Sequence, residues 1–383
     1  MKKTHFAAAL LLTAFSLFAG PRYELRFQGD RNLLFRDGAE LGFRDCVREQ
    51  RKRHPSMQAE DLLKQCYQGA FGPGHIIGRT ETAKKNFDSE FASVAARPDE
   101  PLFEIISPDF MRVNLGAWKA SGMPSEWLFR MFEDSARTFQ DSDRVLQNYL
   151  DEAEGLLQEE ERSRFAKMRK EMQSAPHHSQ KYRDSEAPSY RLVSTRLLPA
   201  LPVLAKATAL PDKPVHVLVI DGRSASGKTT LARQLASILK TDVVHMDDFF
   251  LPPELRTKDR YAEPGGNVHY ERFMQEVLPH LRDPEPFSYR RFDCSTMKPG
   301  DMRDIRSGQW RIVEGAYSLH PKFGRYADLT IFYDITPEEQ ARRILLRNGE
   351  RGLKMFQSRW IPLEELYIRE CDPIRRADLV IGR

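Results

Sequence analysis

The chain has 383 residues, of which 40% are hydrophobic and 30% are charged, and its formal net charge is +4. This length and apolar content suit two domains with ordinary cores. Lys and Arg are interleaved with Asp and Glu, so a broad nucleic-acid-binding face is not expected. The four cysteines show no C-x-x-C spacing, which favours reduced thiols over a disulfide framework or a zinc site.

The first 20 residues begin with Met1-Lys2-Lys3 and continue with an apolar run from Phe6 to Phe18. A basic start before a short apolar run is typical of a secretory signal, and the run is too short for a comfortable membrane span. The cleavage end is poor, because a cut after Ala19 leaves Leu17 at the minus-three position. We favour an upstream extension, such as a misassigned start, or an apolar tail, and a true signal stays open as the alternative.

Residues 21–56 are charged and irregular in pattern, whereas residues 57–205 predict a mostly helical domain. Expected within that domain are helices at 58–67, 125–139 and 145–157, a solvated charged helix at 158–173, a polar loop at 176–188 and a connector at 197–210.

Three histidines of this domain, His75, His177 and His178, suggest a metal site at first sight. No two of them share a helix at ligand spacing, so we expect each to be a hydrogen-bonding loop residue instead. Arg112, Asn114 and Tyr182 are compatible with a ligand pocket, but the sequence does not decide whether they form one.

Residues 212–383 alternate between strand and helix patterns, which predicts an α/β domain with a parallel sheet flanked by helices. The strand candidates are 215–220, 242–246, 286–290, 310–314, 328–333 and 378–381, and the helix candidates are 228–239, 268–282, 336–348 and 362–370. Ligands of such sheets bind at the carboxyl ends of the strands.

The first of these strands runs into a complete G-x-x-x-x-G-K-[ST] motif, from Gly222 to Thr229. The glycines let backbone N–H groups approach phosphate oxygens, and the next helix adds the positive end of its dipole. Lys228 is expected to reach the β- and γ-phosphates and Thr229 to bind Mg²⁺. The expected ATP-binding residues are Gly222, Arg223, Ser224, Ala225, Ser226, Gly227, Lys228, Thr229 and Thr230.

Acidic residues follow two later strands of this domain. Asp247 and Asp248 come directly after the second strand, and Glu314 ends the strand at 310–314. Phosphoryl transfer to a hydroxyl needs a carboxylate to accept the proton, and a second acid at a strand end suits Mg²⁺. Arginines such as Arg343 and Arg347 supply the cations that the migrating group needs.

Two further segments are placed to form an acceptor pocket. PGGNVHY, residues 264–270, is a glycine loop in which Asn267 is a candidate cap for the next helix. Residues 288–293 lie at the end of the following strand. The candidate acceptor contacts are Asp247, Asn267, Tyr289 and Arg291.

The loop and the segments MDDFF, PGGNVHYERF, RIVEGAYSLHP and ARRILLRNGERG occur in the order seen in the uridine kinase and phosphoribulokinase-like P-loop kinases, which residues 213–383 resemble. The resemblance implies that Asp247 is the base, that Glu314 lies near Mg²⁺, and that Arg343 and Arg347 belong to a lid. The pyrimidine-binding Tyr and His of uridine kinases have no match in YRRFDCSTM, where Phe292 stands at the Tyr position. The resemblance therefore implies kinase chemistry more strongly than it implies uridine as the acceptor. The preceding domain resembles an uncharacterised helical module fused to such kinases.

We expect a cytoplasmic, ATP- and Mg²⁺-dependent kinase that phosphorylates a small nucleoside-like or sugar-like acceptor, without nucleic-acid or membrane partners, and homo-oligomerisation stays open. One alternative is an NTP-hydrolysing switch acting through the helical domain, and another is a nucleotide-binding regulatory protein without catalysis. The acidic MDDFF segment and the PGGN loop argue against the switch, which needs no acceptor pocket. Asp247 argues against the regulatory protein, which needs no base.

Overall fold

The computed structural model describes residues 21–28, 31–77, 80–137 and 142–382. The signal-like segment at 1–20 lies outside them. The chain divides into two compact units, residues 1–209 and 210–383, and each is described by itself. Among the described residues, no helix is long and apolar enough to cross a membrane.

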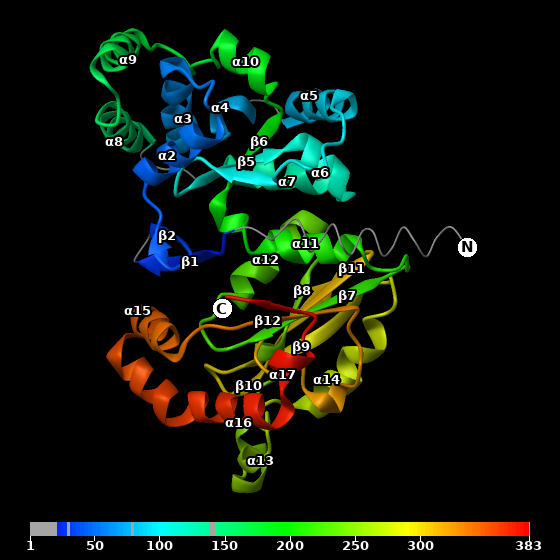
Figure 1. Ribbon diagram of the computed structural model, residues 1–383. Helices are drawn as coiled ribbons and strands as arrows, with labels where there is room; N and C mark the ends of the chain where they lie inside the picture. Colours follow the sequence, from blue (N-terminus) through cyan, green and yellow to red (C-terminus); the bar gives the residue numbers. More distant parts are fainter. Residues whose placement is uncertain (1–20, 29–30, 78–79, 138–141, 383) are drawn as a thin grey trace. The chain divides into compact units, whose positions relative to one another are not determined.

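The first unit is mostly helical, as predicted, and it also contains two small antiparallel sheets (Figure 1). Its helices are α2 (Phe43–Arg53), α3 (Ala59–Phe71), α4 (Gly74–Ile77), α5 (Thr80–Ser93), α6 (Leu115–Ser121), α7 (Ser125–Ser135), α8 (Ser142–Glu154), α9 (Glu159–Glu171), α10 (Gln180–Glu186) and α11 (Ala200–Thr208). Its strands are β1 (Tyr23–Gln28), β2 (Arg31–Arg36), β3 (Ala39–Glu40), β4 (Phe103–Ile105), β5 (Phe110–Asn114) and β6 (Tyr190–Ser194).

Two sequence interpretations of this unit are wrong. Residues 21–56 are not irregular, because they form β1–β3 and α2, and Phe43 and Val47 of α2 are buried in the core that α3 and α8 share. The polar segment 176–188 is not all loop, because it contains α10. The predicted connector at 197–210 contains the apolar helix α11. The charged helix at 158–173 is observed as α9, which buries only Phe165.

A buried carboxylate joins α3 to α10. Asp61 accepts hydrogen bonds from Nδ1 of His178 at 2.8 Å, from the backbone N–H of Ser179 at 3.0 Å and from its hydroxyl at 2.6 Å, and from the backbone N–H of Gln58 at 2.9 Å. Burial raises the pKa of Asp61, but these hydrogen bonds hold it at about 2. His178 is thus a hydrogen-bonding residue, as expected. Among the side chains that the structure describes, no group of three or more His, Cys, Asp or Glu residues could hold a metal ion.

The second unit contains a five-stranded parallel sheet in the order β13-β12-β7-β11-β8. The strands are β7 (His216–Gly222), β8 (Val243–His245), β11 (Trp310–Glu314), β12 (Leu329–Tyr333) and β13 (Leu379–Ile381). The helices are α12 (Lys228–Leu239), α13 (Lys258–Ala262), α14 (Tyr270–Glu276), α15 (Pro337–Met355), α16 (Ile361–Cys371) and α17 (Pro373–Arg376). The predicted parallel sheet flanked by helices is confirmed, with five of the six predicted strands in it, and the helix predicted at 268–282 is shorter than expected.

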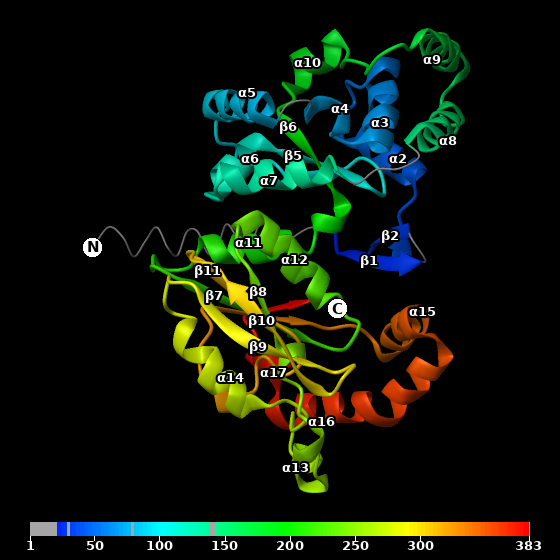
Figure 2. The ribbon, with the colours of Figure 1, turned by 180° about the vertical axis from the view of Figure 1, so that it is seen from behind.

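Helices cover both faces of this sheet because each central strand is apolar on both sides. Val217 and Val219 of β7 pack with Phe273 of α14 and Tyr367 of α16. The alternate residues of β7 face the other side, on which α12 lies (Figure 2). The β7–α12 loop is thereby held at the carboxyl end of the central strand.

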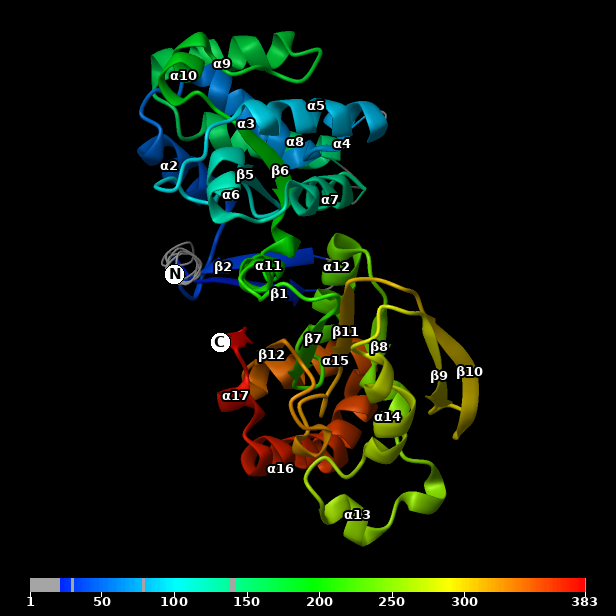
Figure 3. The same cartoon turned by 90° about the vertical axis from the view of Figure 1, so that its right-hand side faces the viewer.

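The strand predicted at 286–290 is not part of this sheet. It is observed as β9 (Phe287–Asp293), which pairs with β10 (Lys298–Ile305) in a separate antiparallel hairpin (Figure 3). Alternating exposed and buried side chains in β9 fit a strand with one solvated face rather than a central parallel strand.

Acidification is expected to destabilise the first unit through His178. Burial and the positive charge of Arg112 lower the pKa of His178 to about 4, whereas an unfolded histidine titrates near 6.5. Between these values the unfolded chain binds more protons, so stability falls as the pH falls, by at most about 1.4 kcal/mol per unit.

Hydrogen exchange of α3 amides, corrected for intrinsic rates, measures this effect. His178→Gln should make the pH dependence of α3 protection between pH 6.5 and 4 shallower, and His280→Gln in the second unit should leave it unchanged. Equal slopes in wild type and His178→Gln would contradict the assignment.

Candidate active site

The loop between β7 and α12 wraps tightly because three of its residues adopt positive φ. These residues are Gly222 at +152°, Ala225 at +62° and Gly227 at +111°. A Cβ at Gly222 would lie 2.3 Å from the carbonyl oxygen of Tyr333 in β12. Residues 223–227 thus form a turn that joins the end of β7 to the N-terminus of α12, as the motif predicts.

Asp221, which the motif does not include, fixes the start of this loop. Its buried carboxylate accepts from the N–H groups of Gly222 at 2.6 Å, Tyr317 at 3.1 Å and Leu319 at 3.0 Å, and from the hydroxyl of Tyr367 at 2.7 Å. Burial raises the pKa of Asp221 to about 6, and the four hydrogen bonds oppose the rise. Its only sequence signal is a lone acid at the end of an apolar strand.

The α16 helix holds the outer side of the loop. Glu364 is 4% exposed and accepts from the backbone N–H of Ser224 at 3.1 Å and from Gln340 at 2.9 Å. Arg223 forms a buried ion pair with Asp334 at 2.9 Å. Side chains therefore stabilise the first half of the loop, and no sequence pattern marks Glu364 for this role.

The two predicted lid arginines have different surroundings. Arg343 is buried, donates to the carbonyl oxygen of Ser226 at 2.6 Å and pairs with Glu339 at 2.6 Å, so it supports the loop rather than standing free above it. Arg347, one turn later, is exposed and donates to the side chain of Asn348. The helix α15 continues to Met355 with a break at Gly349, where φ is +69°, in place of the predicted end at 348.

The two predicted metal-binding residues lie together. The Thr229 hydroxyl is 3.1 Å from one carboxylate oxygen of Glu314, and Nδ1 of His245 is 2.6 Å from the other. Lys228 donates to the carbonyl oxygen of Arg223 at 3.3 Å. A hydroxyl and a carboxylate are the hard oxygen donors that Mg²⁺ prefers, so these residues fit the ion. Sequence analysis did not single out His245.

The neighbouring acids Asp247 and Asp248 have opposite environments. Asp248 is 8% exposed and accepts from the Tyr289 hydroxyl at 2.8 Å. Asp247 is exposed, and within the described part of the chain no group hydrogen-bonds to its carboxylate. The pKa of Asp247 is raised overall. Nearby protein atoms partly exclude water from its carboxylate and raise the pKa, the positive charge of Lys228 lowers it, and the negative charge of Glu314 raises it. Asp247 is thus the accessible acid of the pair.

The candidate acceptor residues are only partly brought together. Tyr289 is 1% exposed and its hydroxyl donates to Asp248, so that hydroxyl is already used within the protein. Asn267 does not cap α14, because His269 does so by accepting from the N–H of Arg272. The Asn267 side-chain oxygen is buried, with no hydrogen-bond partner among the described residues. Arg291 lies on the β9–β10 hairpin, within 4.0 Å of Asp293.

A pocket of about 680 Å³ adjoins this hairpin. The residues that line it are Pro252, Glu254, His269, Arg272, Glu276, Ser288, Tyr289, Arg290, Phe292, Met297, Lys298, Pro299 and Met302. Tyr289 connects its wall to the Asp247–Asp248 pair, and the lining supplies a histidine, His269, that the YRRFDCSTM segment itself lacks.

The parallel sheet with its phosphate loop on the central strand defines a P-loop nucleotide-binding fold, and it confirms the predicted fold class. No family model matches the chain. The chain is 26% identical over 137 residues to a cytidylate kinase from Pyrobaculum arsenaticum, a match that covers 35% of this chain and 61% of that protein. The second unit therefore resembles P-loop kinases, as predicted.

Two solved structures are also similar to this chain. A possible uridine kinase from Bacillus stearothermophilus matches with a TM-score of 0.37 and 22% identity, over 46% of this chain and 92% of that one. The YGR205w protein matches with a TM-score of 0.31 and 12% identity, over 47% of this chain and 86% of that one.

Replacing Gly222 by alanine is expected to damage the loop, because the new Cβ meets the backbone of β12 and φ stays positive. The variant should lose about 1–3 kcal/mol of stability, measured by thermal unfolding. Gly308→Ala is the matched control, since its Cβ would have no neighbour closer than 3.8 Å. Equal melting temperatures for the two variants would contradict the close approach.

Proposed function

We propose that the protein is an ATP-dependent phosphotransferase whose acceptor is a hydroxyl of a small metabolite with a nucleoside-like or sugar-like shape. The observation that carries the proposal is the contrast between two adjacent acids beside the phosphate loop. Asp248 is used within the protein, whereas Asp247 is accessible and unpaired among the described residues. A free carboxylate near the phosphate site is what hydroxyl activation needs and what a nucleotide switch does not.

In this proposal each group has one role. The backbone N–H groups from Ala225 to Thr229 and the Lys228 ammonium bind the phosphates, and Asp247 orients the acceptor hydroxyl and takes its proton. Arg347 is free to turn toward the transferred group, whereas Arg343 keeps the loop in shape through its bond to Ser226. The pocket beside β9 and β10 receives the rest of the acceptor.

Mg²⁺ would be held by the Thr229 hydroxyl and the Glu314 carboxylate. When bound, it neutralises charge on the β- and γ-phosphates. His245 keeps the Glu314 carboxylate oriented through its 2.6 Å hydrogen bond. Orientation of a metal-binding carboxylate by a neighbouring donor is a common requirement of such sites.

ATP consumption with Mg²⁺ against nucleosides, sugars and vitamin precursors tests the proposal. We expect turnover to appear with one acceptor class and to stay near background without it. Lys228→Ala should abolish this turnover, because no ammonium group then stabilises the negative charge on the phosphates. Acceptor-independent turnover would favour the switch, and binding without turnover would favour a regulatory protein.

Comparison of Asp247→Asn with Asp248→Asn tests the assignment of the base. With the responsive acceptor, Asp247→Asn should bind ATP normally and lose about 10²–10⁴-fold in turnover. Asp248→Asn should keep most of its turnover and lose about 1 kcal/mol of stability, since it weakens the bond to Tyr289. The reverse pattern would show that the wrong carboxylate has been assigned.

A further inference from the structure

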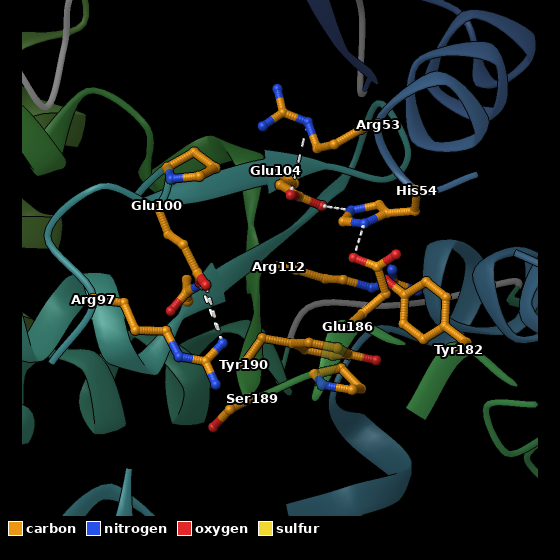
Figure 4. Close-up of a pocket in the computed structure, with 13 residues that line it drawn as sticks. Arg53, His54, Arg97, Glu100, Glu104, Arg112, Tyr182, Glu186, Ser189 and Tyr190 are labelled. Carbon is orange, nitrogen blue, oxygen red and sulfur yellow. Dashed lines mark hydrogen bonds and ion pairs between the residues drawn. The ribbon is translucent and has the colours of Figure 1, made fainter. Parts of the chain in front are cut away.

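The polar face of the small sheet β4-β5-β6 forms the floor of a pocket of about 280 Å³ in the first unit (Figure 4). Arg112 and Asn114 lie two residues apart on β5, so their side chains share one face, while Met111 and Val113 are fully buried on the other. In the strand register, Glu104 of β4 lies opposite Arg112, and Tyr190 of β6 lies opposite Asn114. These four side chains therefore lie on the same face of the sheet, which forms the floor of the pocket.

Part of the wall comes from α2 and α10. Arg53 and His54 follow each other at the end of α2, and Tyr182 and Glu186 lie on α10. His54 bridges two acids, with Nε2 2.9 Å from Glu104 and Nδ1 2.9 Å from Glu186. Burial lowers the pKa of His54, but the two glutamates raise it overall.

Arg112 has an unusual set of partners for a buried cation. It is 3% exposed, and its three hydrogen bonds go to neutral amide oxygens: Nε and Nη2 to Gln68 and Nη1 to Gln50. Within the described residues it forms no ion pair. A guanidinium has five N–H donors, so two remain, and a buried charge without a counter-ion is costly.

The glutamates of the lining are occupied by other partners. Glu100 accepts from Arg97 at 3.1 Å and from Asn114 at 2.5 Å, and Glu104 and Glu186 share His54. Three arginines thus line the pocket with three carboxylates, and each carboxylate bonds to a partner other than Arg112.

We propose that this pocket binds a small metabolite through a carboxylate or phosphate group seated on Arg112. The planar guanidinium offers paired donors to such an oxyanion, and the ligand supplies the direct ion-pair partner that Arg112 lacks among the described residues. Arg53 and Arg97 add positive charge at the rim, and Pro101 and Pro188 line the apolar part. The volume limits the ligand to a small molecule.

Calorimetry on the full chain tests this binding. The Lys228→Ala background weakens anion binding at the phosphate loop of the second unit, and all variants below are compared in this background, so residual binding there is common to them. The probes are succinate and malate for carboxylates, and inorganic phosphate and glycerol 3-phosphate for phosphates. Glycerol and choline are the neutral and cationic controls. We expect one anion set to bind and both controls to give no heat, and the responding set identifies the group.

Three variants locate the site. Arg112→Gln should weaken binding by about tenfold or more, because it removes the charged fork. Arg53→Gln should also weaken it, whereas Arg51→Gln should not. Arg51 and Arg53 are both partly exposed arginines of α2 paired with one glutamate each, at 2.9 and 3.7 Å, but only Arg53 lines the pocket.

The Arg53–Arg51 comparison remains decisive if Arg112→Gln does not fold. The proposal is overturned by an absence of anion binding at tens of millimolar, by full binding in folded Arg112→Gln, or by equal effects of Arg53→Gln and Arg51→Gln.

Discussion

The buried carboxylate of Asp221 is the constraint on which the candidate active site depends. It joins the end of β7, the loop after β11 and the helix α16 through three backbone N–H groups and one hydroxyl. These segments are far apart in sequence. Because its first bond is to the N–H of Gly222, any movement of the carboxylate moves the start of the phosphate loop. Glu364 and Arg343 then hold the rest of the loop from outside.

A second principle of the site is that neighbours in sequence have opposite environments. Asp248 is buried on Tyr289, and Asp247 beside it is exposed. Arg343 is fixed on the loop, and Arg347 one turn later is exposed. In each pair one residue supports the structure and the other stays accessible. The proposed chemistry assigns the reactive roles to the accessible members.

The sequence predicts the local parts of this arrangement well, because they depend on local patterns. The strand at 215–220, the glycine loop and the helix at 228–239 follow from apolar runs and glycine spacing, and the structure confirms them. It also predicts that Thr229 and Glu314 are close, since α12 begins just beyond the carboxyl end of β7 and Glu314 ends β11 at the same edge of the sheet.

The predictions fail where contacts between residues far apart in the sequence determine the structure. The pairing of β9 with β10 instead of the main sheet, and the bond from Tyr289 to Asp248, depend on contacts that no local pattern specifies. The sequence of residues 21–56 wrongly predicts an irregular segment, because charges hide the apolar side of α2, which Phe43 and Val47 form. The sequence also does not decide whether Arg112 and Asn114 share a pocket, because only strand register brings their side chains together.

The central claim is that the γ-phosphate of ATP passes to a small-molecule hydroxyl. The most direct test follows the label of γ-³²P-ATP in wild-type protein incubated with Mg²⁺ and each class of acceptor. The account predicts a labelled phosphomonoester of one acceptor class that forms in step with ADP. Label recovered only as inorganic phosphate, whatever acceptor is present, would contradict it.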